Sequence, residues 1–176
     1  RVRGLGAVFA RDMKLSLRFV EGVWLENAYR ISPFLDRLTA KDSVINLGSL
    51  QADAPLSLVL ELGINQKPPG EHRVVQLELV ADIQALGRQG EKMRRDISTT
   101  FTPNEPSEAE VVQPGILSAL SKITIYRMQE RVWDTIEDGN VDDATRQLEM
   151  IATRLFDLGE SRLARAAMLE AGRIAK

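Results

Sequence analysis

Cysteine is absent from the 176 residues, histidine occurs once, and aromatic residues make up only 5% of the chain. Without cysteine, disulfides and thiol catalysis are excluded. The single histidine, His72, lies in the turn PPGEHR, and no nucleophile stands in a recognisable motif for it to activate. We therefore expect a protein that is not an enzyme and holds no cofactor.

Charge and hydropathy exclude further classes. The net charge of −2 gives no reason to expect nucleic-acid binding, and the basic residues near the amino end are typical of a solvated face. No apolar run approaches the roughly 20 residues that span a bilayer, and no signal peptide is visible. We expect a cytoplasmic globular protein without a membrane partner. Because the sequence does not begin with methionine, a signal upstream of it would not be seen.

Before residue 104, apolar and polar residues alternate, which predicts half-buried β-strands. In DMKLSLRFV, the residues Met13, Leu15 and Leu17 fall on one face. The period recurs in GVWLENAYRI (with Val23, Leu25, Tyr29 and Ile31 on one face), SVINLG, APLSLVLELGI, HRVVQLELVADI and EKMRRDISTTFT (with Met93, Ile97 and Phe101). No helical pattern interrupts these segments. Residues 1–104 are therefore predicted to form an antiparallel, Ig-like β-sandwich of about six to seven strands.

After the Pro-rich, acidic connector TPNEPSEAEVVQPG, the period becomes helical. We predict that residues 105–176 form a three-helix unit packed on or beside the sandwich, which makes the fold class α+β. The helices are expected at about Pro114 to Asp138, at Val141 to Leu158 with Gly159 as terminator, and within ESRLARAAMLEAGRIA. The second helix has one clean apolar stripe, made of Val141, Ala144, Leu148, Ile151, Ala152 and Leu155.

The first predicted helix changes its apolar face along its length. Ile116, Leu120 and Ile123 lie on one side, and a second set lies nearly opposite: Val132, Trp133 and Ile136. We expect the two sets to meet different neighbours, one the sandwich and the other the following helices. Trp133 and Ile136, close to the turn at Gly139, are the residues we place against the second helix.

Two sequences resemble metal sites. EDGNVDDATRQLE places four oxygen ligands at the offsets of a calcium loop: Asp138, Asn140, Asp142 and Glu149. However, Asp143 occupies the position that requires glycine, and the apolar stripe makes this segment helix. We therefore predict a turn between helices, in which Gly139 ends one helix and Asn140 caps the next.

The second sequence, DISTT, is close to the Asp-x-Ser-x-Ser metal motif of von Willebrand type A domains. That motif should follow a buried apolar strand, whereas Asp96 follows EKMRR. No metal site is predicted here either.

The candidate partner contacts are the tryptophans and tyrosines, Trp24, Tyr29, Tyr126 and Trp133. Large aromatic side chains often anchor interfaces. The alternative is that they pack in the core with only a polar tip exposed.

Several segments carry a resemblance to known proteins: LRFVEGVWLENAYRISP, INLGSLQADAPLSLVLEL, RVVQLELVADI and ITIYRMQERVWDTIEDGNVDDATRQLEMIATRLFDLGESRLARAAMLEAGRI. They resemble the region that follows the von Willebrand factor type A domain in a group of bacterial proteins. The resemblance implies a β-sandwich and a helical tail downstream of a type A domain that binds a divalent cation at its own motif. This sequence lacks that domain, so metal-dependent binding carries over to no residue here.

Two hypotheses of function follow. The favoured one is a non-enzymatic structural and protein-interaction module, which positions and supports a type A domain of the parent chain and contacts an unknown protein partner. The alternative is a sandwich-type ligand- or carbohydrate-binding module, or an accessory domain of an enzyme. It would require exposed aromatic residues or paired carboxylates clustered on one face.

Overall fold

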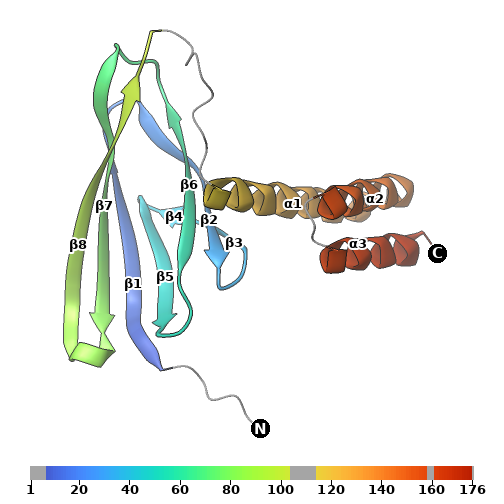
Figure 1. Ribbon diagram of the computed structural model, residues 1–176, viewed down its shortest axis with the longest axis horizontal. Coiled ribbons are helices and arrows are strands. Elements are labelled where there is room, and N and C mark those ends of the chain that lie inside the picture. The colour runs from blue at the N-terminus through green and yellow to red at the C-terminus, as the bar shows by residue number, and fades with distance from the viewer. Residues whose placement is uncertain (1–6, 104–113, 158–160, 176) are drawn as a thin grey trace. The chain divides into compact units, whose positions relative to one another are not determined.

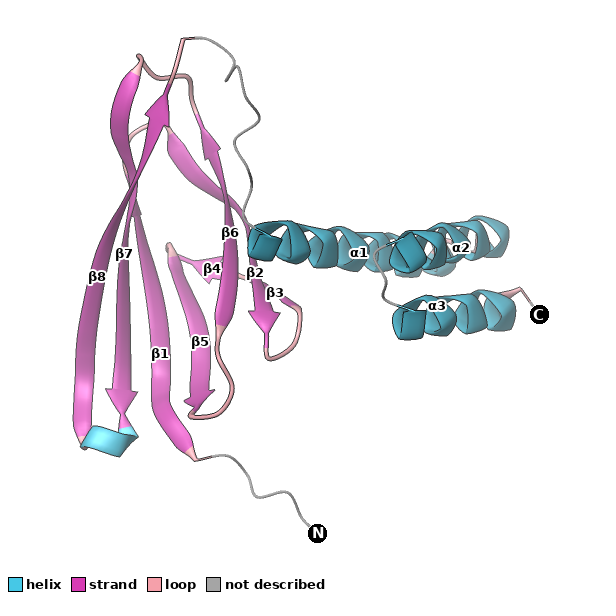
Figure 2. Cartoon of the chain, viewed as in Figure 1, coloured by secondary structure: helices cyan, strands magenta, loops and turns pink. Residues whose placement is uncertain are grey.

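The computed structural model describes residues 7–103, 114–157 and 161–175, and the chain divides into two compact units, residues 1–111 and 112–176 (Figure 1). The first unit holds two antiparallel sheets and the second holds three helices (Figure 2). The fold class is therefore α+β with a three-helix carboxyl-terminal unit, as the two hydrophobic periods predict.

The two sheets differ in width. The larger has five strands in the order β4-β5-β1-β7-β8 and the smaller has three in the order β3-β2-β6. Their bounds are β1 Val8–Phe19, β2 Val23–Ser32, β3 Asp36–Leu38, β4 Ala40–Lys41, β5 Val44–Gln51, β6 Ser57–Ile64, β7 Gly70–Ile83 and β8 Arg88–Phe101, with the short helix η1 Gln84–Leu86 before β8. The described residues thus form eight strands rather than six or seven. The additional β3 and β4 have only three and two residues, too few to show an alternation.

Facing side chains of both sheets form one core. As predicted, Met13, Leu15 and Leu17 of β1 are buried. They pack in one cluster with residues of the other strands, including Val23 and Ala28 of β2, Ile45 and Leu47 of β5, and Val74 and Val75 of β7. The partly buried leucines of β6 and β7 adjoin the same cluster.

An irregularity in β2 corrects one predicted orientation. The sequence predicts Tyr29 on the same face as Val23 and Leu25, but the pairing with β6 shifts register between Leu25 and Asn27. An extra residue in one strand reverses the alternation that follows it. Ala28, opposite Leu60, therefore joins the core cluster, and Tyr29 points to the other face of the sheet, where it is still only 1% exposed.

The helices of the second unit are α1 Pro114–Glu137, α2 Val141–Asp157 and α3 Ser161–Ile174. Their core is the predicted stripe of α2 without Val141, joined by Val132 of α1 and by three alanines of α3, Ala164, Ala167 and Ala171. Ile136 packs against this cluster as predicted, whereas Trp133 is 59% exposed, so its predicted placement against α2 is wrong. Gly159 lies outside the described residues.

The turn between α1 and α2 confirms the predicted helix boundary. Gly139 adopts φ 79°, its N–H donates to the carbonyl of Ile136 at 2.9 Å, and the N–H of Asn140 donates to that of Thr135 at 3.0 Å. This pair of bonds is a Schellman motif, which satisfies carbonyls at the end of a helix. At the start of α2, the N–H of Asp143 donates to Oδ1 of Asn140 at 3.4 Å, the geometry of an N-cap.

Candidate functional site

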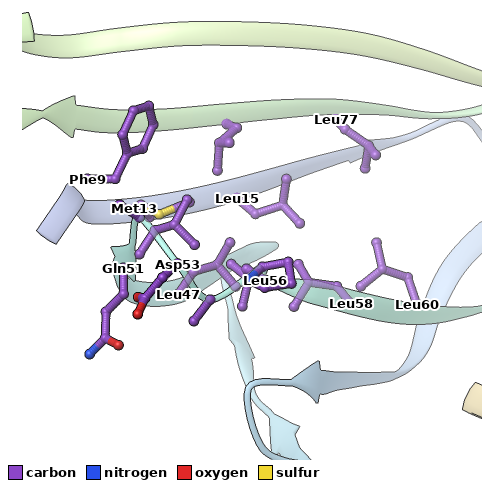
Figure 3. A pocket seen from close by; sticks show the side chains of 15 residues that line it. Phe9, Met13, Leu15, Leu47, Gln51, Asp53, Leu56, Leu58, Leu60 and Leu77 are labelled. Carbon is purple, nitrogen blue, oxygen red and sulfur yellow. The ribbon is translucent and has the colours of Figure 1, made fainter. Parts of the chain in front are cut away.

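The sandwich contains an apolar cavity of about 720 Å³ between its two sheets, which we call the leucine groove (Figure 3). Its lining comes from β1, β5, β6, β7 and the turn before β6: Phe9, Met13, Leu15, Leu47, Leu50, Gln51, Ala52, Asp53, Ala54, Pro55, Leu56, Leu58, Leu60, Leu77 and Leu79. Gln51 and Asp53 supply the polar side chains of this lining. The volume falls in the range of about 300–1,000 Å³ that is usual for binding pockets.

The groove exists because the smaller sheet leaves part of the larger one uncovered. Leu58 and Leu60 of β6 and Leu77 and Leu79 of β7 line the groove, yet all four are only half-buried. Met93 of β8 pairs with Leu79 and so lies on the same face of the sheet. The alternation of this strand predicts Met93 on its apolar, half-buried face, but Met93 is 68% exposed.

The strand that borders this opening, β6, has one edge that pairs with no other described strand. Strand β6 is the last strand of the smaller sheet and, among the described residues, pairs only with β2. Proteins shield edge strands by making them short, charged or proline-containing. Strands β3 and β4 are short, and β8 carries four basic residues, Arg88, Lys92, Arg94 and Arg95. By contrast, β6 is eight residues long and reads SLVLELGI, with a single charge at Glu61.

The face of β7 and β8 that carries Leu77, Leu79 and Met93, which we call the uncovered face, also carries a cation that forms no ion pair with a described residue. Arg95 is exposed and pairs with Leu77, so its side chain rises from the same face as that leucine. Within the described part of the chain, no carboxylate forms an ion pair with Arg95. Glu91, which lies on this face of β8 too, is paired with Arg88 at 3.7 Å. Beside its apolar residues, this face therefore carries the Arg88–Glu91 pair and one cation, Arg95, that forms no ion pair with a described residue.

The opposite face of the larger sheet is polar and internally paired. Glu78 of β7 is 7% exposed and accepts a hydrogen bond from Arg94 of β8. This bond lowers the pKa of the Glu78 carboxyl, against the opposing effect of burial, and the nearby charges of Lys92 and Arg18 lower it further. The carboxylate thus holds β7 to β8 behind the groove.

The four aromatic candidates have different environments. Trp24 of β2 is 44% exposed, lies over Gly63 of β6, and lines a second hollow of about 670 Å³ on the sandwich. Tyr29 is buried, Tyr126 is half-buried and Trp133 is exposed. Each unit thus presents one exposed tryptophan, so neither builds an aromatic platform from these four residues.

The residues considered for metal binding do not converge. The four residues of the calcium-loop pattern are exposed: Asp138, Asn140, Asp142 and Glu149. The chain is helical from Val141 onward, so these residues do not form a loop around an ion. Asp96 lies within β8, where it accepts a hydrogen bond from Gln76 at 2.9 Å. In the part of the chain that the structure describes, no group of three histidines, cysteines or carboxylates could hold a metal ion.

The single histidine, His72, lies in β7 and is half-buried. Its Nε2 lies 2.9 Å from the carbonyl of Pro68, and its ring meets the edge of Phe101 at 5.6 Å between centroids. These contacts fix the histidine ring at the end of the β7–β8 pair.

For the described helices, none combines the length and hydropathy that crossing a bilayer requires.

Comparison with known proteins supports the two-part architecture. Residues 114–176 match the family described as "Sll0103-like, C-terminal alpha-helical domain". A solved structure, von Willebrand factor type A from Catenulispora acidiphila, superposes with a TM-score of 0.68 over 91% of this chain, at 14% sequence identity. At that identity the likeness shows the fold alone. This chain spans 39% of the length of that structure. No curated protein matches the sequence.

Sequence reasoning missed the leucine groove and Arg95. The alternation in β6 and β7 correctly identifies their apolar faces, but it cannot show how far the opposite sheet extends. The difference in charge between the edge strands could have pointed to this site, because charged residues are concentrated in β8 and nearly absent from β6.

Proposed function

We propose that this chain is a non-enzymatic structural and protein-interaction module that positions and supports a von Willebrand type A domain of the same polypeptide. The observation that carries the proposal is the structural likeness to a protein named as a von Willebrand factor type A, which extends over 91% of the chain but only 39% of the neighbour. The match of the three helices to a family described as a C-terminal domain supports the same order along the chain.

The surfaces of the sandwich favour interaction with a polypeptide. An apolar groove beside a strand that pairs on one side only, among the described strands, offers both a hydrophobic surface and an edge for strand pairing. Catalysis instead needs a nucleophile or an acid–base pair in hydrogen-bond reach. The carbohydrate-binding alternative depends on clustered exposed aromatics, and the four candidates here are divided between two units and between exposed and buried positions.

The test is to produce the chain and the type A domain of its parent polypeptide as separate proteins. We expect the two to co-elute in size-exclusion chromatography, and the thermal midpoint of the type A domain to rise when this chain is added. A variant of the chain with reversed charge at Lys14, an exposed residue outside the groove, serves as the control. Independent elution with an unchanged midpoint would refute the proposal.

A further inference from the structure

We infer that the leucine groove and the edge of β6 form a docking site for one extended polypeptide strand. This strand is apolar at alternate positions and carries an acidic residue that faces Arg95. The inference rests on the proposed function and specifies the contact by which the module holds its partner. The docked strand would be the fourth of the smaller sheet, in the order β3-β2-β6-partner.

The first support is the mismatch between the sheets. Five strands face three, and β7 and β8 carry side chains on this face that are not fully covered. These are the half-buried Leu77 and Leu79 of β7 and the exposed Met93 and Arg95 of β8. A strand added beside β6 covers this face, because neighbouring strands lie only about 4.8 Å apart and packed sheets about 10 Å apart. The same addition extends the smaller sheet at β6, which among the described residues pairs only with β2.

The second support is the character of β6 itself. Every other sheet edge in the described chain is short or charged, and β6 alone is long and apolar. An edge of this kind pairs readily with another strand. A small apolar molecule could fill the groove, but it would add no strand to the smaller sheet beside β6.

The third support is charge. Among the described residues, no carboxylate pairs with Arg95 on this face, since Glu91 is already held by Arg88 at 3.7 Å. A strand docked over this face must either leave Arg95 unsatisfied beneath it or offer it a carboxylate. Burying a charge without a partner is costly, so complementarity selects an acidic residue at an inward position of the incoming strand.

The probe is a donor strand fused to the amino end of the full chain through a flexible Gly/Ser linker, which supplies millimolar effective concentration. The strand has about eight residues, within the usual length of strands. Valine and threonine alternate, and one central valine is replaced by glutamate. A second donor carries lysine at that position. Both donors are combined with the wild-type chain, with Arg95→Glu, and with Lys14→Glu as the matched control on the other face of the sheet.

We expect the glutamate donor to slow hydrogen exchange at the β6 amides by about tenfold or more in the wild-type chain and in Lys14→Glu. The lysine donor should protect β6 less, and Arg95→Glu should reverse this preference. Loss of the charge preference, or absence of protection with both donors, would overturn the inference.

Two further outcomes would also overturn it. Concentration-dependent protection of β6 in the unfused chain, with dimers in analytical ultracentrifugation, would assign the edge to a second copy. Stoichiometric binding of laurate, with release of the donor strand, would assign the groove to an acyl chain. If the donor strand fails to protect β6 but the type A domain still co-elutes with the chain, the module holds its partner elsewhere and only the docking site is wrong.

Discussion

The helical unit and the sandwich close their cores to different degrees. In the helical unit, Ile151 and Ala164 are completely buried, because small residues on α3 let it lie close against α2. In the sandwich, inward leucines of β6 and β7 remain half-buried around a cavity of about 720 Å³. Two helices bury their apolar residues against each other when each helix has an apolar stripe. A β-sandwich buries its core fully only when its two sheets are also of matching width. The open core is therefore the reason why we expect a partner to complete the sandwich rather than the helical unit.

The largest expected difference separates truncations in the two cores. Ile151→Ala should cost roughly 2–5 kcal/mol of unfolding free energy, because it opens a cavity in a closed core. Leu60→Ala should cost about 1 kcal/mol, since Leu60 is half-buried beside space that is already empty and loses less apolar contact.

Denaturant titration can follow each unit by its own tryptophan. Trp24 reports the sandwich and Trp133 the helical unit, so Trp133→Phe and Trp24→Phe backgrounds isolate the two signals. Equal losses from the two truncations would contradict the distinction between a closed and an open core.

A second prediction tests whether the helical unit depends on its turn. Asn140→Ala removes the side-chain acceptor for the N–H of Asp143 and should lower the stability of the helical unit by about 1 kcal/mol. Asn140→Asp keeps the acceptor and is the matched control. The sandwich signal from Trp24 should not move, and an unchanged midpoint for Asn140→Ala would remove Asn140 as the cap.

A smaller effect is expected from Glu78, because its partner Arg94 is 57% exposed and solvent screens the pair. The pKa of Glu78 is lowered below its ordinary value of 4.5, so its carboxylate stabilises the fold above that pH. This contribution disappears as the pH falls through the lowered pKa. Glu78→Gln should therefore make the unfolding free energy of the sandwich depend less steeply on pH in the acidic range.

Glu71→Gln, an exposed acid on the same strand, is the control for this measurement and should leave the pH dependence unchanged. Because the Glu78–Arg94 pair is electrostatic, the difference between wild type and Glu78→Gln should also shrink in high salt. An identical pH dependence for wild type and Glu78→Gln would contradict the assigned role.

The periodicities predicted the local features of both units and missed those that depend on distant strands. The α1–α2 boundary follows from Gly139 and Asn140, whose preferences act within a single turn. Tyr29 was assigned to the wrong face because a register shift before it reverses the alternation. Met93 was placed on the apolar face of its strand, and its pairing with Leu79 agrees with that face, but the three described strands of the smaller sheet leave it 68% exposed.

The smallest expected effect is the one that separates recognition from folding. Arg95→Glu should change the unfolding free energy of the sandwich by no more than about 0.5 kcal/mol, because Arg95 is exposed and forms no ion pair within the described chain. A residue that contributes to the fold would behave otherwise, as Arg94, its neighbour on the other face, should show when changed to glutamate beside Glu78. Urea titration of both variants in the Trp133→Phe background makes the comparison. If Arg95→Glu destabilised the sandwich as much as Arg94→Glu, Arg95 would belong to the folded unit itself. A neutral Arg95→Glu would leave its charge free for a strand supplied by a partner.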